Sequence, residues 1–322
     1  MTEFIPKVVN YESCVRQFRG KQDLAFCFKL EKEDGWTREE GDEDINVIAC
    51  LDGHGPDLIP NILRNMYFKP HFIKDNPIES IQQELDTNIK EYLSKQPWRS
   101  DDTLNSGSTI SFAKIYRNDL TKKLIIKLEW MGDSPIMVFV NGELVFENNL
   151  HSANNTDEVY YLQSRGLDIQ IEQTTSGFKV ISEKEIKSLY GKYLKYGYMN
   201  NNLLAVTRSL GHNRKLPLFE SEKHIIECSS DDDVRVLILS DGVSDLVKKE
   251  FDFDKLNTFT AEQLVDLAEG RWKQEWIYVR NEVKKPYKLS ASGYDDCCCA
   301  LWNQRSIVFR PPLEEATSIT NE

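Results

Sequence analysis

The amino-acid sequence predicts an α+β protein in which antiparallel β-sheet is flanked by helices. Short, apolar and partly alternating segments recur along the chain, as expected for strands. Asn141 and Gly142 join two of these segments, and an Asn-Gly pair is the strongest short-range signal for a hairpin. The helical patterns fall in pairs between groups of strands that short turns connect. This order favours antiparallel sheet over a regular βαβ array.

Several segments have the length and composition of strands. They are residues 24–31, 45–51, 109–116, 124–130, 136–140, 144–147, 234–239 and 297–302. The last one contains Cys297, Cys298 and Cys299. We expect these cysteines to alternate between core and surface, because successive side chains on a strand point to opposite faces.

Three segments have helical spacing. The clearest, residues 76–95, begins with an asparagine cap and a proline in its first turn. A second, residues 260–279, begins with Thr260 and Gln263 in the relation of a capping box. Residues 57–67 form a shorter helix that begins or bends at a proline.

The composition is that of a globular protein, with 40% hydrophobic residues among 322. A net charge of −12 disfavours a nucleic-acid-binding protein, including a nuclease, because phosphate binding needs an excess of Lys and Arg. No stretch approaches the ~18 consecutive apolar residues of a membrane span, so we expect no membrane association. The first ten residues lack the apolar run of a secretory signal.

The sequence contains seven cysteines and no CxxC pair, which predicts neither a zinc site nor a disulfide framework. Free thiols indicate a reducing, intracellular location, in the cytoplasm or the nucleus. We expect one domain over residues 1–310 and a disordered tail over residues 311–322. Within the domain, residues 149–200 are polar and rich in tyrosine, and we expect them to form a long surface excursion, or flap, that influences substrate choice.

Aspartates stand where the predicted strands begin or end. They are Asp23, Asp52, Asp133, Asp241, Asp245, Asp295 and Asp296. Each of them alone is explained by a turn or a helix cap. As a set they are harder to explain in this way, because Asp52-Gly53 and Asp241-Gly242 each follow an apolar strand directly. Both carboxylates could therefore converge at one end of a sheet.

Such a group of carboxylates, with a glycine carbonyl beside them, suits hard cations such as Mg²⁺ or Mn²⁺. Two cations bridged by a carboxylate would activate a water molecule and hold the oxygens of a phosphoryl group. Without cations the carboxylates would repel one another, which also favours bound metal.

Six motifs occur in the order "DGHG", "SGST", "GDS", "LAVTRSLG", "SDGVSD" and a late "DD". This series resembles the metal-dependent protein serine/threonine phosphatases of type 2C, the PPM family. The resemblance runs from about residue 16 to residue 305. It implies two packed antiparallel β-sheets, a β-sandwich, flanked by pairs of antiparallel helices in four layers, αββα. It also implies two Mn²⁺ or Mg²⁺ ions at one edge of the sandwich, and it allows a third.

The resemblance assigns metal ligands residue by residue. Asp52 matches the carboxylate that bridges both ions, and the carbonyl of Gly53 joins the second ion. Asp241 and Asp295 match the remaining ligands of the first ion, although Asp296 beside Asp295 is the alternative.

The family's ligands for the third ion have fewer counterparts in this sequence. Asp245 matches an acid of this loosely held site. The family's Asp-His pair has no clear counterpart in "HSANNTDE", where Asn154 or Asp157 is nearest.

The resemblance also assigns residues that act on water and substrate. Asp23 matches the acid that orients metal-bound water, and His54 matches the residue proposed to protonate the leaving alkoxide. Arg19 is the counterpart of the arginine that grips the substrate phosphate, and Lys21 could share that role. His212 stands where the family usually has Asp. Arg208 is interpreted as a structural hydrogen-bond donor.

The function implied is hydrolysis of phosphoserine or phosphothreonine in phosphorylated protein substrates. A hydroxide bridging the two metal ions would attack phosphorus directly, with no phosphoenzyme. We expect a monomer. The alternative is a pseudophosphatase that keeps the fold as a regulatory or binding module, and a third reading is a hydrolase of another phosphoester, such as a nucleotide. Binding of Mn²⁺ separates the first two, because an inactive module need not bind metal.

Overall fold

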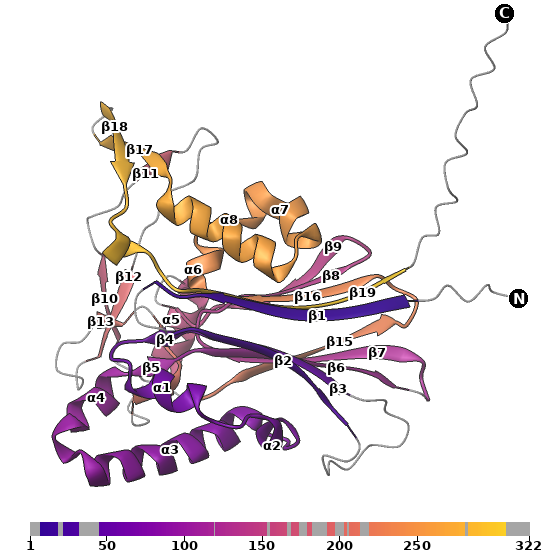
Figure 1. Ribbon diagram of the computed structural model, residues 1–322, viewed down its shortest axis with the longest axis horizontal. Coiled ribbons are helices and arrows are strands. Elements are labelled where there is room, and N and C mark those ends of the chain that lie inside the picture. The colour runs from indigo at the N-terminus through magenta and orange to yellow at the C-terminus, as the bar shows by residue number, and fades with distance from the viewer. Residues whose placement is uncertain are drawn as a thin grey trace, which may run out of the picture.

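The computed structural model of the chain describes residues 7–18, 22–31, 45–118, 120–152, 155–165, 169–173, 179–181, 192–196, 203–204, 206–212, 219–280 and 283–306. Two five-stranded sheets lie face to face, and helices cover the outer face of each (Figure 1). Every strand pair within the two sheets is antiparallel. The four layers implied by the family resemblance are therefore confirmed.

The first sheet has the strand order β1-β19-β16-β8-β9. Its strands are β1 (Lys7–Arg16), β8 (Ile136–Val140), β9 (Glu143–Glu147), β16 (Val234–Leu239) and β19 (Cys297–Ser306). The Asn-Gly turn predicted between β8 and β9 is present. Three helices cover this sheet: α6 (Asp241–Ser244), α7 (Lys249–Thr258) and α8 (Ala261–Lys273) (Figure 1). The predicted capping box of Thr260 and Gln263 begins α8. The expectation that this helix continues to residue 279 is wrong, because it ends at Lys273 and the β-prone Trp, Ile, Tyr and Val that follow form the strand β17 (Glu275–Arg280).

The second sheet has the strand order β15-β7-β6-β3-β2. Its strands are β2 (Leu24–Leu30), β3 (Ile45–Leu51), β6 (Ile110–Asn118), β7 (Lys123–Met131) and β15 (Glu222–Ser229). The helices on this side are α1 (Leu58–Arg64), α2 (Lys69–Phe72), α3 (Pro77–Lys95) and α4 (Ser100–Asn105), with the 3-10 turn η2 (Pro97–Arg99) between the last two. None of the described helices is long and apolar enough to cross a membrane.

Three apolar layers fill the spaces between these four. One lies between α1–α3 and the second sheet, one between the two sheets, and one between the first sheet and α6–α8. The expected alternation of Cys297, Cys298 and Cys299 between core and surface is wrong, because all three are buried. β19 is an inner strand covered on both faces, so Cys298 enters the layer between the sheets and its two neighbours enter the layer beneath the helices.

Three small sheets complete the fold at one end of the sandwich (Figure 1). The first joins β4 (Gly53–His54), β5 (Gly107–Ser108) and β14 (Leu210–Gly211). The others join β10 (Ile169–Gln173), β12 (Lys192–Tyr196) and β13 (Leu203–Leu204), and β11 (Lys179–Ile181), β17 (Glu275–Arg280) and β18 (Val283–Lys288). The 3-10 turn η4 (Ala291–Gly293) leads from β18 towards β19. Part of the predicted excursion over residues 149–200 and all of the predicted tail over residues 311–322 lie outside the described residues.

Several elements were not predicted from the sequence, and four of them show why. β1 and β15 are edge strands whose side chains are mostly exposed or half-buried, so their sequences lack an apolar run. α7 is irregular, with a non-helical residue in its interior. α5 (Thr156–Ser164) lies within the predicted excursion and buries only Glu158, Val159 and Leu162.

The layer between the sheets should carry much of the stability. Ile238 of β16 is fully buried there, whereas Ile225 of β15 is 57% exposed. We predict that Ile238→Ala lowers the free energy of unfolding by about 2–5 kcal/mol, because it removes buried methyl groups and leaves a cavity. The same truncation at Ile225 should change it by only about 0.5 kcal/mol. Equilibrium unfolding in urea measures both, and equal losses would contradict this assignment of the core.

Candidate metal centre

Strand ends from both sheets meet at one edge of the sandwich. Asp52 follows β3 of the second sheet, and Asp241 follows β16 of the first sheet as the first residue of α6. The backbone N–H of Asp241 donates to Asp52 Oδ2 at 3.4 Å, so the two carboxyl-bearing strand ends are in contact. The convergence predicted from the Asp-Gly pairs is therefore present, but it joins two sheets rather than the edge of one.

The backbone of Asp52 is held tightly. Its N–H donates to Thr109 Oγ1 at 3.0 Å, and its carbonyl accepts the Thr109 N–H at 2.8 Å. Gly53 follows in close contact with the chain around it, since a Cβ there would lie 2.5 Å from Pro60 Cγ and 2.7 Å from the Gln22 carbonyl oxygen. Only glycine fits at this point, which leaves its backbone close to the Asp52 carboxylate.

The carboxyl groups at this edge disturb one another's ionisation. Burial, followed by the charges of Asp241 and Asp23, raises the pKa of Asp52 well above its usual range. Burial and the charge of Asp295 do the same to Asp241. Burial raises the pKa of Asp23 to about 7, with Asp296 and Asp295 adding to the effect, although the nearby Ser240 side chain opposes it. The common cause is that carboxylates are brought together away from water.

Asp133 belongs to the same group. It lies in the turn between β7 and β8, and burial, together with Asp245 and Asp295, raises its pKa to about 7. The sequence assigned no role to Asp133, although the "GDS" motif that contains it was among those that carried the resemblance. Asp245 contributes to the raised pKa of Asp241 as well, so it also lies near this edge. Its carboxylate is 3.4 Å from Lys248 Nζ.

These residues fit a divalent cation. Asp23 is 1% exposed, and within the described part of the chain neither of its carboxylate oxygens makes a geometrically acceptable hydrogen bond. Buried carboxylates that repel one another are stabilised when a cation is bound among them. The donors are carboxylate and carbonyl oxygens, which are the ligands of Mg²⁺ and Mn²⁺.

Asp295 and Asp296 differ in their contacts. The Asp296 carboxylate is buried and accepts the backbone N–H groups of Phe18 and, at 2.9 Å, of Gln22. It thereby holds both ends of the segment that contains Arg19 and Lys21. Asp295 is half-buried and acts electrostatically on Asp52, Asp241 and Asp23. Residues 19–21, and with them the predicted phosphate-binding arginine, lie outside the described residues.

His54 faces a second histidine. Its Nε2 lies 2.8 Å from Nε2 of His212, and the two rings stack with centroids 5.0 Å apart. Burial and the neighbouring His212 lower the pKa of His54 to about 3. The imidazole is therefore neutral near pH 7, with Nε2 occupied by His212. The predicted role of His54 as the acid for the leaving group stays a prediction.

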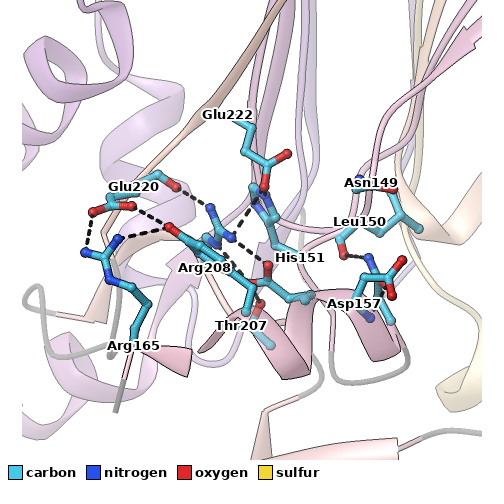
Figure 2. Close-up of polar contacts among 12 residues, drawn as sticks. Asn149, Leu150, His151, Asp157, Arg165, Thr207, Arg208, Glu220 and Glu222 are labelled. Atoms are coloured by element: carbon cyan, nitrogen blue, oxygen red, sulfur yellow. Dashed lines mark hydrogen bonds and ion pairs between the residues drawn. The ribbon is translucent and has the colours of Figure 1, made fainter. Parts of the chain in front are cut away.

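A second candidate group for a metal lies beside the first, around α5. Ligand atoms of His151, Glu158 and Glu222 all lie within 4.8 Å of one another, and among the described residues no three of the strand-end aspartates come that close. Figure 2 shows Arg208 at the centre of this group. Its Nε and Nη2 donate to Glu158 at 2.8 and 2.6 Å, and its Nη2 is 3.4 Å from Glu222.

These contacts make the group a structural cluster. The guanidinium already pairs with both glutamates, and His151 Nδ1 accepts the Gly132 N–H at 3.1 Å. The interpretation of Arg208 as a structural donor is confirmed. Asp157, which was considered for the third ion, is exposed in the first turn of α5, and Asn154 lies outside the described residues.

Comparison with known proteins agrees with this description. The protein phosphatase 2C family model matches residues 12–263. Protein phosphatase fem-2 of Caenorhabditis elegans is 24% identical over 254 residues, which are 77% of this chain and 50% of that protein. The chain thus spans about half the length of this relative.

Solved phosphatase structures align with this chain over most of its length. The PPM Ser-Thr phosphatase MsPP from Mycobacterium smegmatis, in complex with cacodylate, aligns with a TM-score of 0.50 at 15% identity, over 91% of this chain and 97% of that one. The catalytic domain of the phosphatase PstP, in complex with two manganese ions, aligns with a TM-score of 0.48 at 16% identity, over 93% of this chain and 99% of that one. At this identity the likeness to MsPP supports the fold alone.

The raised pKa values predict an unusual pH dependence for the metal-free protein. Folded Asp23 and Asp133 keep their protons up to about pH 7, whereas the unfolded chain releases them near 3.8. The folded state therefore binds more protons between these values, and the free energy of unfolding falls as pH rises. With a chelator present to remove metal ions, we expect the protein to be more stable at about pH 5.5 than at about pH 8, as measured by urea unfolding.

Two controls accompany this measurement. In the double variant Asp23→Asn, Asp133→Asn the decrease should be smaller, because neither side chain titrates. Added Mn²⁺ should stabilise the native protein more at the higher pH, because protons compete with the cation for the carboxylates. Stability that rises with pH over this range in the chelated protein would contradict the electrostatic description of the edge.

Proposed function

This chain belongs to the protein phosphatase 2C family, and we propose that it is a metal-dependent phosphatase that removes phosphate from phosphoserine or phosphothreonine in protein substrates. The observation that carries the proposal is the set of mutually repelling aspartates, half-buried except for the fully enclosed Asp23 and Asp296, where strand ends of both sheets meet. Such a set is unfavourable by itself and suits the binding of cations at a functional site.

We propose Asp52, Gly53, Asp241 and Asp295 as the residues that hold two Mn²⁺ or Mg²⁺ ions. Asp52 suits the bridging position, because the charges of both Asp241 and Asp23 act on its carboxylate and the Asp241 N–H lies 3.4 Å from its Oδ2. Gly53 offers its carbonyl, since its lack of a side chain allows close approach. Asp245, with Asp133 beside it, is proposed for a further ion.

When bound, the ions would neutralise charge on the phosphoryl oxygens and lower the pKa of a water molecule, so that it can attack phosphorus in line. Asp23 would orient that water and accept its proton. One observation supports this role: among the described residues its carboxylate oxygens lack well-formed hydrogen bonds, so they can accept one from water. Arg19 is proposed to hold the substrate phosphate.

The substrate is proposed to be a phosphorylated protein, bound by a monomer. All seven cysteines are free, which supports a reducing, intracellular compartment. Because the chain spans half of its relative from Caenorhabditis elegans, nothing specific to that protein is carried over.

The activity is tested with purified protein, Mn²⁺ and a phosphothreonine peptide, by measuring released phosphate. We predict Mn²⁺-dependent turnover that Asp241→Asn lowers by at least about 100-fold, because it removes a proposed ligand and one negative charge. Asp254→Asn is the matched control, since Asp254 is exposed on α7, and it should leave the rate unchanged. Tight Mn²⁺ binding without phosphate release would instead favour the pseudophosphatase. Turnover that persists in Asp241→Asn would contradict the proposed ligand set.

The same Asp→Asn substitution should have different effects at Asp295 and at Asp296. We predict that Asp295→Asn weakens Mn²⁺ binding by about tenfold or more, measured by calorimetric titration. Asp296→Asn should leave Mn²⁺ affinity within about twofold but raise KM for the phosphopeptide, because an amide cannot accept both the Phe18 and Gln22 N–H groups as a carboxylate does. The reverse pattern would identify Asp296 as the ligand.

A further inference from the structure

Three short strands bring two histidines to the turn that follows β3. β5 pairs with β4 on one side and with β14 on the other. His54 is opposite Gly107 in the first pair, and Gly211, which precedes His212, is opposite Gly107 in the second. This small sheet joins segments that are far apart in the sequence.

The surroundings are shaped around the two rings. A Cβ on Gly107 would lie 2.3 Å from Nε2 of His212 and 2.5 Å from Nε2 of His54, so no side chain fits between them. His212 is fully buried and adopts a φ of 48°, in the left-handed region that few residues other than glycine occupy. Its backbone N–H donates to the Ser106 carbonyl at 2.9 Å. A strained, fully buried residue with this support indicates a specific role.

We relate this role of His212 to the turn formed by residues 52–54. One nitrogen of His54 is held by His212 at 2.8 Å, and the two rings stack. Thr109 holds the backbone of Asp52 through its hydroxyl and its N–H. The turn is therefore fixed at Asp52 by Thr109 and at His54 by His212. Between these two points lie the Asp52 carboxylate and the Gly53 carbonyl.

We propose that His212 is a positioning residue for the metal centre: by holding His54, it fixes the turn that presents Asp52 and Gly53. This inference rests on the proposed function of the site. Groups that orient metal ligands typically contribute about 10–100-fold to metal affinity or activity. His54 then acts through the backbone of the turn, and not by facing the leaving group.

The test compares His212→Gln with His212→Met in the full chain. The two side chains have similar length and meet the same backbone strain, but only the glutamine amide can donate to His54 Nε2. We expect His212→Met to weaken Mn²⁺ binding and to lower kcat by about tenfold. His212→Gln should retain both within about threefold, with KM unchanged. If His212→Met does not fold, His212→Asn replaces it, because asparagine tolerates the positive φ but is too short to reach His54.

Two substrates separate positioning from proton donation. p-Nitrophenyl phosphate has a leaving group that needs no proton near neutral pH, whereas a phosphoserine peptide has one that does. If His212 positions the turn, His212→Met should lower kcat by the same fraction on both substrates. A loss confined to the phosphopeptide would overturn the proposal in favour of proton donation by the histidine pair, and equal behaviour of the Gln and Met variants would overturn it as well. If the unmodified protein releases no phosphate, the proposed function fails, but the Mn²⁺ affinities still decide the role of His212.

Discussion

Repulsion between carboxylates crowded at the meeting point of two sheets is the constraint on which the rest of the structure depends. Asp52 and Asp241 approach from opposite sheets, and Asp23, Asp133 and Asp295 raise the electrostatic cost of keeping them there. A fold that holds such a set must draw its stability from elsewhere. The three apolar layers provide it, because each sheet is covered on both faces.

The polar surroundings of the edge hold the aspartates in place. Thr109 holds the backbone of Asp52, Asp296 holds the segment that leads into Asp23, and the small sheet holds His54. Farther out, Arg208 is buried between Glu158 of α5 and the start of β15. Breaking a buried ion pair of this kind by removing one partner typically destabilises a protein by about 3–5 kcal/mol. The Arg208 cluster therefore attaches the start of the long excursion to the sandwich.

The sequence predicted the inner strands well, since the segments that became β3, β7, β8 and β16 are short apolar runs. It did not predict the edge strands β1 and β15, because their exposed side chains carry no such signal. It also misjudged Cys297–Cys299, because alternation on a strand shows which face a residue takes but not whether that face is covered.

At the site, sequence order identified the aspartates but not the contacts that distinguish them. Asp295 and Asp296 are adjacent and chemically identical, and their exposure and the contacts of Asp296 with the backbone amides of Phe18 and Gln22 distinguish them. His212 was noted as a departure from the family's usual Asp. Its contact with His54 depends on pairing between β4, β5 and β14, which are each two residues long and leave no periodic pattern in the sequence.

The central claim is that the aspartates where the strand ends meet form a metal centre, and the direct measurement is a crystal structure of Mn²⁺-soaked protein with anomalous scattering at the manganese edge. The account predicts two anomalous peaks at the edge of the sandwich, both within bonding distance of Asp52, with Asp241 and Asp295 on one of them. Manganese bound instead among His151, Glu158 and Glu222, with Arg208 displaced, or no peak near Asp52 and Asp241, would contradict it.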